Sequence, residues 1–148
     1  MPHRVLFLCT GNYYRSRFAE ILFNALAEEG GLAWHAVSRG LATERGLHNV
    51  GAISPQAVAG LAARGVALPR PVHWPLQVLW SDLHAAGLAV ALKEKEHRPL
   101  LEARFPAWAG RVEYWHIDDL EDVPAGQALP QIERRVRALL DRLTVEAL

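Results

Sequence analysis

The stretch that decides the fold runs from Val5 to Ser16 and reads VLFLCTGNYYRS. Its first four residues are apolar, which predicts a buried strand, and a helical pattern begins at Ser16. The turn between this strand and this helix contains glycine and asparagine, and it presents backbone N–H groups around a concavity. Unpaired N–H groups and the positive end of the helix dipole converge there, so we expect the turn to bind an oxyanion.

Cys9 and Arg15 give this turn its chemistry. A thiol at a helix N-terminus beside an arginine ionises more readily, because the dipole and the guanidinium favour the thiolate. The thiolate is a nucleophile, and the planar fork of Arg15 can hold two oxygens of a tetrahedral anion. Ser16 is placed to donate its hydroxyl to the sulfur. The alternative is a cysteine that serves only as a small buried hydrophobe; the strand, turn and helix around Cys9 favour the reactive thiol.

The sequence from Cys9 to Ser16 resembles the signature loop of the low-molecular-weight protein tyrosine phosphatases, Cys-x-Gly-Asn-x-x-Arg-Ser, at that family's usual N-terminal place. The resemblance extends along most of the chain. It implies that Cys9 forms a phosphocysteine intermediate and that Arg15 holds the phosphoryl oxygens. It also implies a phosphate-binding loop made of Thr10, Gly11, Asn12, Tyr13, Tyr14 and Ser16.

Length and composition favour one domain over residues 1–148, with 51% hydrophobic residues to build a core. The formal net charge of zero gives no global field for nucleic acid or an anionic membrane. No apolar run reaches the ~20 residues of a membrane span and no secretory signal is evident, so we expect a cytoplasmic protein. The single cysteine excludes an intramolecular disulfide and a thiolate zinc site. We expect neither a metal nor a cofactor, because fixed positive groups can neutralise the charge of a phosphate.

Strand and helix patterns alternate after the turn. Further strands are predicted over residues 32–37, 88–92 and 112–117, and residues 42–53 are predicted to form a loop. Helices are predicted over residues 16–29, 54–64, 81–86, 93–102 and 132–143. The charges of the segment 93–102 are most simply a solvated face. This order predicts an α/β fold with a four-stranded parallel sheet, helices on both faces and the phosphate loop after strand 1.

Polar residues follow three of the predicted strands and meet at the carboxyl edge of the sheet, where ligands bind in such folds. Cys9 follows the first strand, Ser38 the second, and Asp118-Asp119 the fourth. The resemblance implies that Ser38 supports the phosphate loop from behind; an ordinary turn serine is the alternative. It also places His48 at a position where the family has an aromatic residue on the pocket rim, although an exposed loop histidine is otherwise plain surface.

A leaving oxygen must receive a proton when a thiolate displaces it from phosphorus. The family's acid is an aspartate after the last strand, usually followed by proline. Asp119 matches it, with Leu120 in place of the proline. Asp118 stays open as the alternative and Asp122 as a more distant one, and a solvated acidic loop without a catalytic role is the other interpretation.

The chain departs from the family in three places. Tyr14 stands where many members have a second cysteine, so no disulfide can protect Cys9. The segment 120–122 offers no ring where the family tends to have tyrosines, which leaves Tyr13, Tyr14, His48 or Trp74 to form a wall of the pocket. A family histidine that bonds the loop asparagine lies near Pro71; here His73 comes two residues later, and whether it takes that place is open.

The sequence therefore predicts a phosphomonoesterase, most simply a protein tyrosine phosphatase acting on a phosphotyrosine-containing protein or a small aryl phosphate. Two alternatives stay open. One is an arsenate reductase that uses an external thiol, and the other is a phosphate-binding relative without catalytic activity. Nucleic acid and membranes are not expected partners, and the sequence favours no oligomeric state.

Overall fold

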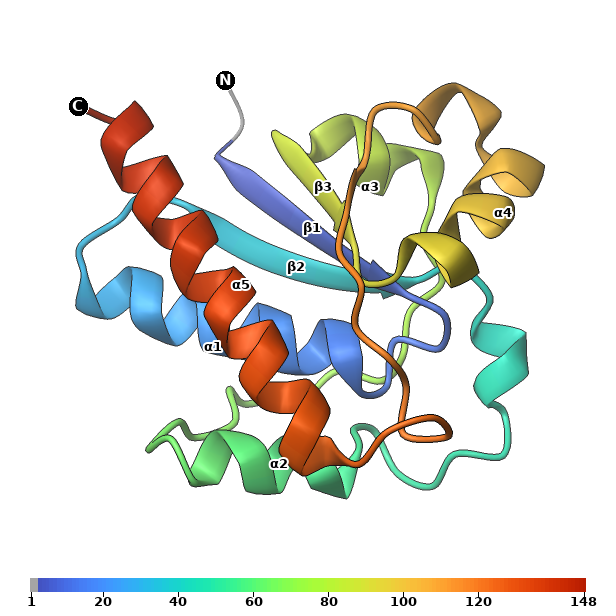
Figure 1. The fold of residues 1–148 in the computed structure, drawn as a ribbon, viewed down its shortest axis with the longest axis horizontal. Coiled ribbons are helices and arrows are strands. Elements are labelled where there is room, and N and C mark those ends of the chain that lie inside the picture. Colours follow the sequence, from blue (N-terminus) through green and yellow to red (C-terminus); the bar gives the residue numbers. More distant parts are fainter. Residues whose placement is uncertain (1–2) are drawn as a thin grey trace.

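The sheet has four parallel strands in the order β2-β1-β3-β4. The structure is a computed structural model that describes residues 3–148. The strands are β1 (Arg4–Cys9), β2 (His35–Gly40), β3 (Leu88–Ala91) and β4 (Glu113–Tyr114). The fold class predicted from the sequence is confirmed. Because all strands point the same way, their carboxyl ends meet at one edge of the sheet (Figure 1).

Helices cover both faces of the sheet (Figure 1). One layer contains α1 (Arg15–Glu29), α2 (Pro55–Ala62) and α5 (Ala125–Glu146), and the other contains α3 (Trp80–Ala85) and α4 (Glu94–Arg104). Successive side chains of β1 alternate between them: Val5 and Phe7 belong to one buried cluster, Leu6 and Leu8 to the other. This alternation is the two-residue period of a strand that is buried on both faces.

Two strands have other bounds than predicted, because a strand extends only as far as it pairs with its neighbour. The second strand runs over His35–Gly40 rather than 32–37, because β1 pairs with it only from Arg4 opposite His35 to Cys9 opposite Gly40. The edge strand β4 keeps only two residues of the predicted 112–117. Beyond it the chain leaves the parallel register, and the next bridge, between Lys93 and His116, is antiparallel.

Helix ends lie within two residues of the prediction except in α5, which runs over Ala125–Glu146 rather than 132–143. Ser54 caps α2, where its Oγ accepts a hydrogen bond from the backbone N–H of Gln56 at 3.2 Å, and Pro55 is the first helical residue. The predicted loop 42–53 contains one short 3₁₀ turn, Thr43–Gly46, and a second, Pro106–Trp108, follows α4. No helix in the described part of the chain is long and apolar enough to cross a membrane.

Candidate active site

Residues 9–16, called the Cys9 loop below, turn from the end of β1 into the start of α1. Asn12 adopts a left-handed backbone conformation there, with φ +54°, and its side chain is fully buried. Its Nδ2 donates to Ser16 Oγ at 2.9 Å and to Ser38 Oγ at 3.0 Å, and its Oδ1 accepts from the backbone N–H of Leu76 at 3.0 Å. Asn12, Ser16 and Ser38 therefore form the support behind the loop.

Cys9 is buried at the end of β1 and next to the N-terminus of α1. Its Sγ lies 3.0 Å from Ser16 Oγ, within hydrogen-bond distance for sulfur. The sulfur thus has a hydroxyl partner within the loop, as the sequence predicts. It is the only cysteine of the chain.

Arg15 is the first residue of α1, and its side chain is only 2% exposed. Nη1 donates to the backbone carbonyl of Ile117 at 2.9 Å, and Nη2 donates to Glu96 Oε2 at 2.5 Å. Asp119 Oδ2 lies 3.6 Å from the same Nη2. Burial disfavours the charged guanidinium, but the negative charges of Cys9, Glu96 and Asp119 raise the pKa of Arg15 above its ordinary value. Arg15 is a fixed cation at the base of the site.

The sequence left three aspartates as candidates for the general acid, and they lie in different places in the structure. Asp119 lines the pocket with Cys9 and Arg15, and its Oδ1 accepts from the backbone N–H of Leu120 at 2.8 Å. Asp118 is paired with the ammonium of Lys93 instead. Asp122 is not among the residues that line the pocket. The geometry therefore favours Asp119 for proton transfer.

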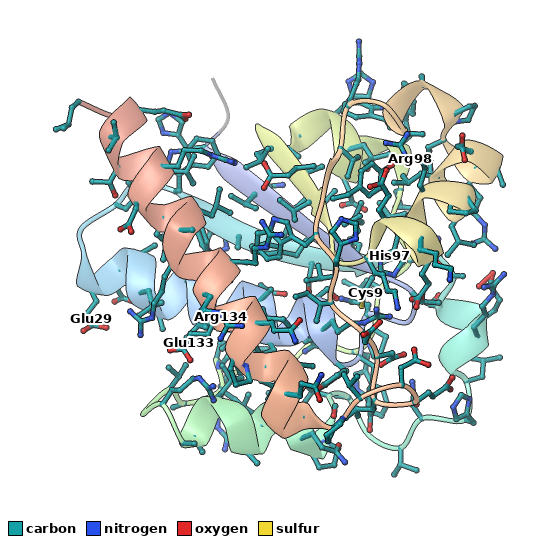
Figure 2. The ribbon with its side chains drawn as sticks, in the orientation of Figure 1. Cys9, Glu29, His97, Arg98, Glu133 and Arg134 are labelled. Atoms are coloured by element: carbon teal, nitrogen blue, oxygen red, sulfur yellow. The ribbon has the colours of Figure 1, made fainter. Side chains whose placement is uncertain are left out.

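The pocket has a volume of about 460 Å³ and opens over the Cys9 loop. The predicted site residues on its wall are Cys9, Thr10, Gly11, Tyr13, Tyr14, Arg15, His48 and Asp119. Trp74, which the sequence also offered as a wall, is 64% exposed and does not line it. Figure 2 shows Cys9 at this edge of the sheet, with His97 of α4 beside it and Arg98 farther away.

The two tyrosines of the Cys9 loop are held differently. Tyr13 donates its hydroxyl to the carbonyl of Val50 at 2.6 Å and so ties the loop to the segment that carries His48. Tyr14 is 4% exposed, and its hydroxyl has no hydrogen-bond partner among the described residues. Burial, with the charge of Asp119, raises the pKa of Tyr14 to about 12. The phenol of Tyr14 is therefore uncharged at neutral pH, and it forms part of the pocket wall.

His73 does not bond the loop asparagine. Its Nε2 lies 3.5 Å from Glu20 Oε1, and Glu20 accepts the hydroxyl hydrogen of Ser38. The backbone N–H of Leu76 takes the place next to Asn12 instead. The histidine thus reaches the Cys9 loop only through Glu20 and Ser38.

The prediction that the charges of segment 93–102 form a solvated face is wrong for Glu96. Its side chain lines the pocket and accepts hydrogen bonds from Arg15 and from the hydroxyl of Thr10. The next residue, His97, is completely buried. One signal for this was available: the segment directly follows β3 at the carboxyl edge of the sheet, where the other site residues gather. Arg45, which also lines the pocket, carries the same signal, because its loop follows β2 at that edge.

Comparison with known proteins gives consistent matches. A family model described as "Low molecular weight phosphotyrosine protein phosphatase" matches residues 4–147. A low molecular weight protein-tyrosine-phosphatase of Streptomyces coelicolor is 41% identical over 100 residues, which span 68% of this chain and 58% of that protein. A protein-arginine-phosphatase of Bacillus subtilis is 29% identical over 108 residues, which span 73% of this chain and 67% of that protein. The crystal structure of a low molecular weight protein tyrosine phosphatase from T. tengcongensis superposes with a TM-score of 0.74 at 26% identity, covering 98% of this chain and 99% of that one.

Proposed function

Because this chain belongs to the low molecular weight phosphotyrosine protein phosphatase family, we propose that it hydrolyses phosphate monoesters with Cys9 as the nucleophile. One observation carries the proposal: Cys9, Arg15 and Asp119 line the same pocket. A nucleophile, an anion-binding fork and a carboxyl group that can carry a proton therefore line one pocket. These are the parts that phosphoryl transfer through a covalent intermediate requires.

In the first step, the Cys9 thiolate attacks phosphorus in line with the leaving oxygen. The S–P bond forms as the P–O bond breaks, and Asp119 gives its proton to the departing oxygen. Arg15 and the backbone N–H groups of the Cys9 loop hold the other three phosphoryl oxygens, on which the transition state spreads its charge. The products of the step are a phosphocysteine and an alcohol or phenol.

In the second step, water hydrolyses the phosphocysteine. The Asp119 carboxylate takes a proton from the attacking water, the P–O bond forms and the S–P bond breaks. Sulfur leaves as a thiolate, and Ser16 stabilises it because its hydroxyl lies 3.0 Å from Cys9 Sγ. Inorganic phosphate then leaves the pocket.

Phosphotyrosine in a protein, or a small aryl phosphate, is the first candidate substrate. Tyr13, Tyr14 and Leu120 line the pocket and give a flat or apolar wall against which an aromatic ring can pack. They take the place of the tyrosines that the sequence lacks after Asp119. His48 and Asn49 also line the pocket and offer polar contacts.

Phosphoarginine in a protein is the second candidate, and the charge of the pocket favours it. Besides Glu96, which is hydrogen-bonded to Arg15, the wall carries the carboxylates of Asp119 and Glu121. They attract a guanidinium leaving group and do nothing comparable for a phenol. The Bacillus subtilis relative that is named a protein-arginine-phosphatase is 29% identical to this chain. In this case Asp119 would protonate nitrogen as the P–N bond breaks.

Two peptides that differ only in the phosphorylated residue, tyrosine or arginine, test the proposal and rank the candidates. We expect phosphate release from both and a higher kcat/KM for the tyrosine peptide, in line with the ring-sized apolar wall. A higher kcat/KM for the arginine peptide would make phosphoarginine the preferred substrate. Release from neither peptide would contradict the proposed function.

A further inference from the structure

Glu96 lies where α4 meets both ends of the Cys9 loop. From the first turn of α4, its Oε2 accepts a hydrogen bond from Arg15 Nη2 at 2.5 Å and another from the hydroxyl of Thr10. The side chain is 28% exposed, and its exposed part belongs to the pocket that holds Cys9. One carboxylate therefore connects the first residue after the cysteine with the arginine that closes the loop.

His97 holds this carboxylate from behind. The backbone N–H of Lys93 donates to His97 Nδ1 at 3.0 Å, so the hydrogen of the neutral ring is on Nε2, which lies 2.9 Å from Glu96 Oε2. Burial lowers the pKa of His97 and keeps the ring neutral. Burial opposes the ionisation of Glu96, but hydrogen bonds from His97, Arg15 and Thr10, with the charge of Arg15, hold its pKa well below the usual range. Glu96 is thus a carboxylate in a fixed position at neutral pH.

The hydrogen bonds of Arg15 define how its fork can meet a phosphate. A guanidinium has five N–H donors. One from Nη1 goes to Ile117 and one from Nη2 goes to Glu96, on opposite branches of the fork. The other three donors make no hydrogen bond to the residues that the structure describes. Without Glu96, the carbonyl of Ile117 alone would hold the guanidinium, which could then rotate about that single bond.

The nearest alternative partner for Arg15 is Asp119. Asp119 Oδ2 lies 3.6 Å from the same Nη2, which is beyond hydrogen-bond distance, whereas Glu96 lies at 2.5 Å. A hydrogen bond from Arg15 would favour the ionised form of Asp119 more strongly than this ion pair does, and would oppose the proton that the leaving group needs. In the structure Glu96 accepts this hydrogen bond, and Asp119 forms only the longer ion pair with Arg15.

We propose that Glu96 is a positioning residue for phosphoryl transfer: it holds the fork of Arg15 toward the phosphate site and takes the Nη2 hydrogen bond that Asp119 would otherwise accept. The inference rests on the proposed function, because it assigns Arg15 to the phosphate and Asp119 to the leaving group. Glu96 acts through Arg15 and takes no part in bond making or proton transfer.

Two variants separate the hydrogen bonds of Glu96 from its charge. Glu96→Gln and Glu96→Ala both remove the negative charge, but only glutamine keeps an oxygen that can accept from Arg15 and Thr10. Glu94→Gln is the matched control in the same turn of α4, because Glu94 pairs with Arg98 at 2.9 Å and does not line the pocket. Each variant is assayed with p-nitrophenyl phosphate and with phenyl phosphate, whose poorer leaving group depends more on protonation. Binding of inorganic phosphate is titrated in parallel by calorimetry.

We expect kcat for p-nitrophenyl phosphate to be about 10- to 10²-fold lower in Glu96→Ala than in Glu96→Gln, the worth of hydrogen bonds to a charged group. The difference should be larger with phenyl phosphate, and Glu96→Ala should bind inorganic phosphate at least about tenfold more weakly than Glu96→Gln. Glu94→Gln should match the wild type in all three measurements.

Equal kcat and equal phosphate affinity in the two Glu96 variants would overturn the proposal, as would the same losses in Glu94→Gln. An equal factor for the two esters would overturn the part that concerns Asp119. If the wild type hydrolyses neither ester, the proposed function fails, whereas the phosphate titration still decides whether Glu96 positions Arg15.

Discussion

The side-chain amide of Asn12 donates to the hydroxyl of Ser38 across 3.0 Å and so joins the Cys9 loop to β2. The same nitrogen lies 2.9 Å from Ser16 Oγ, which in turn lies 3.0 Å from Cys9 Sγ. A continuous line of hydrogen bonds therefore runs from the neighbouring strand to the sulfur. The position of the nucleophile depends on a residue that touches no substrate.

Replacing Asn12 tests this support. Asn12→Ala loses the bonds to Ser16, Ser38 and the backbone of Leu76, and it puts an alanine at φ +54°. We expect the free energy of unfolding to fall by about 2–4 kcal/mol, measured by urea titration. Asn12→Gly loses the same bonds without the backbone strain and should lie between alanine and wild type. An unchanged urea midpoint in Asn12→Ala would show that the bonds contribute nothing.

Gly40 sits where the end of β2 meets the Cys9 loop. A Cβ at this position would lie 2.8 Å from the carbonyl oxygen of Thr10 and 2.6 Å from Thr43 Cγ2. We expect Gly40→Ala to displace the loop and lower kcat/KM for p-nitrophenyl phosphate by at least about tenfold. Gly110→Ala is the matched control, since a Cβ there has no atom within 4 Å. Full activity in Gly40→Ala would mean that the loop tolerates displacement at this contact.

The two adjacent aspartates should differ sharply in their effect on turnover. Asp119 lines the pocket, whereas Asp118 is paired with Lys93. We expect Asp119→Asn to lower kcat by about 10²–10⁴, the usual contribution of a general acid, and Asp118→Asn to stay within a few-fold of wild type. Steady-state kinetics with phenyl phosphate measures both. The reverse order would assign the proton transfer to Asp118.

His97 should make stability depend on pH near neutrality. Its side chain is completely buried, and burial lowers its pKa below the ordinary value of about 6.5. Below about pH 6.5 the unfolded chain therefore takes up a proton on His97, while the folded chain does not. The free energy of unfolding then decreases as the pH falls, by at most about 1.4 kcal/mol per pH unit.

Urea unfolding at pH 7.5 and pH 5.5 measures this loss. His97→Gln removes the titrating ring while the other groups that face it, Glu96, Arg15 and Asp119, stay in place. The variant should show a smaller decrease in the free energy of unfolding between the two pH values than the wild type. An identical decrease in both proteins would exclude His97 as its source.

The sheet and the location of the site are predictable because both follow from local patterns. Val5 to Leu8 and Leu88 to Leu92 are uninterrupted apolar runs, and such runs form strands that are buried on both faces. Once the strands alternate with helices, parallel order follows, and residues after the strands meet at one edge. Cys9 and Asp119 lie at that edge, as the sequence predicts.

Contacts between elements decide what the sequence leaves open. Glu94 and Glu96 are indistinguishable as acidic residues in the first turn of a helix, yet one pairs with Arg98 and the other with Arg15. The choice depends on how α4 packs against the Cys9 loop. Similarly, which aspartate faces the pocket depends on the residue at which β4 ends. Pairing between β3 and β4 sets that residue.

Hydrolysis of p-nitrophenyl phosphate by the wild type and by Cys9→Ser, with EDTA present, decides whether Cys9 is the nucleophile of a phosphatase. We expect turnover by the wild type and none by Cys9→Ser, together with retained binding of inorganic phosphate in the variant, because Arg15 and the loop N–H groups remain. Turnover by Cys9→Ser would contradict the assignment of Cys9 as the nucleophile. A wild type that binds phosphate without turnover would contradict the phosphatase function itself.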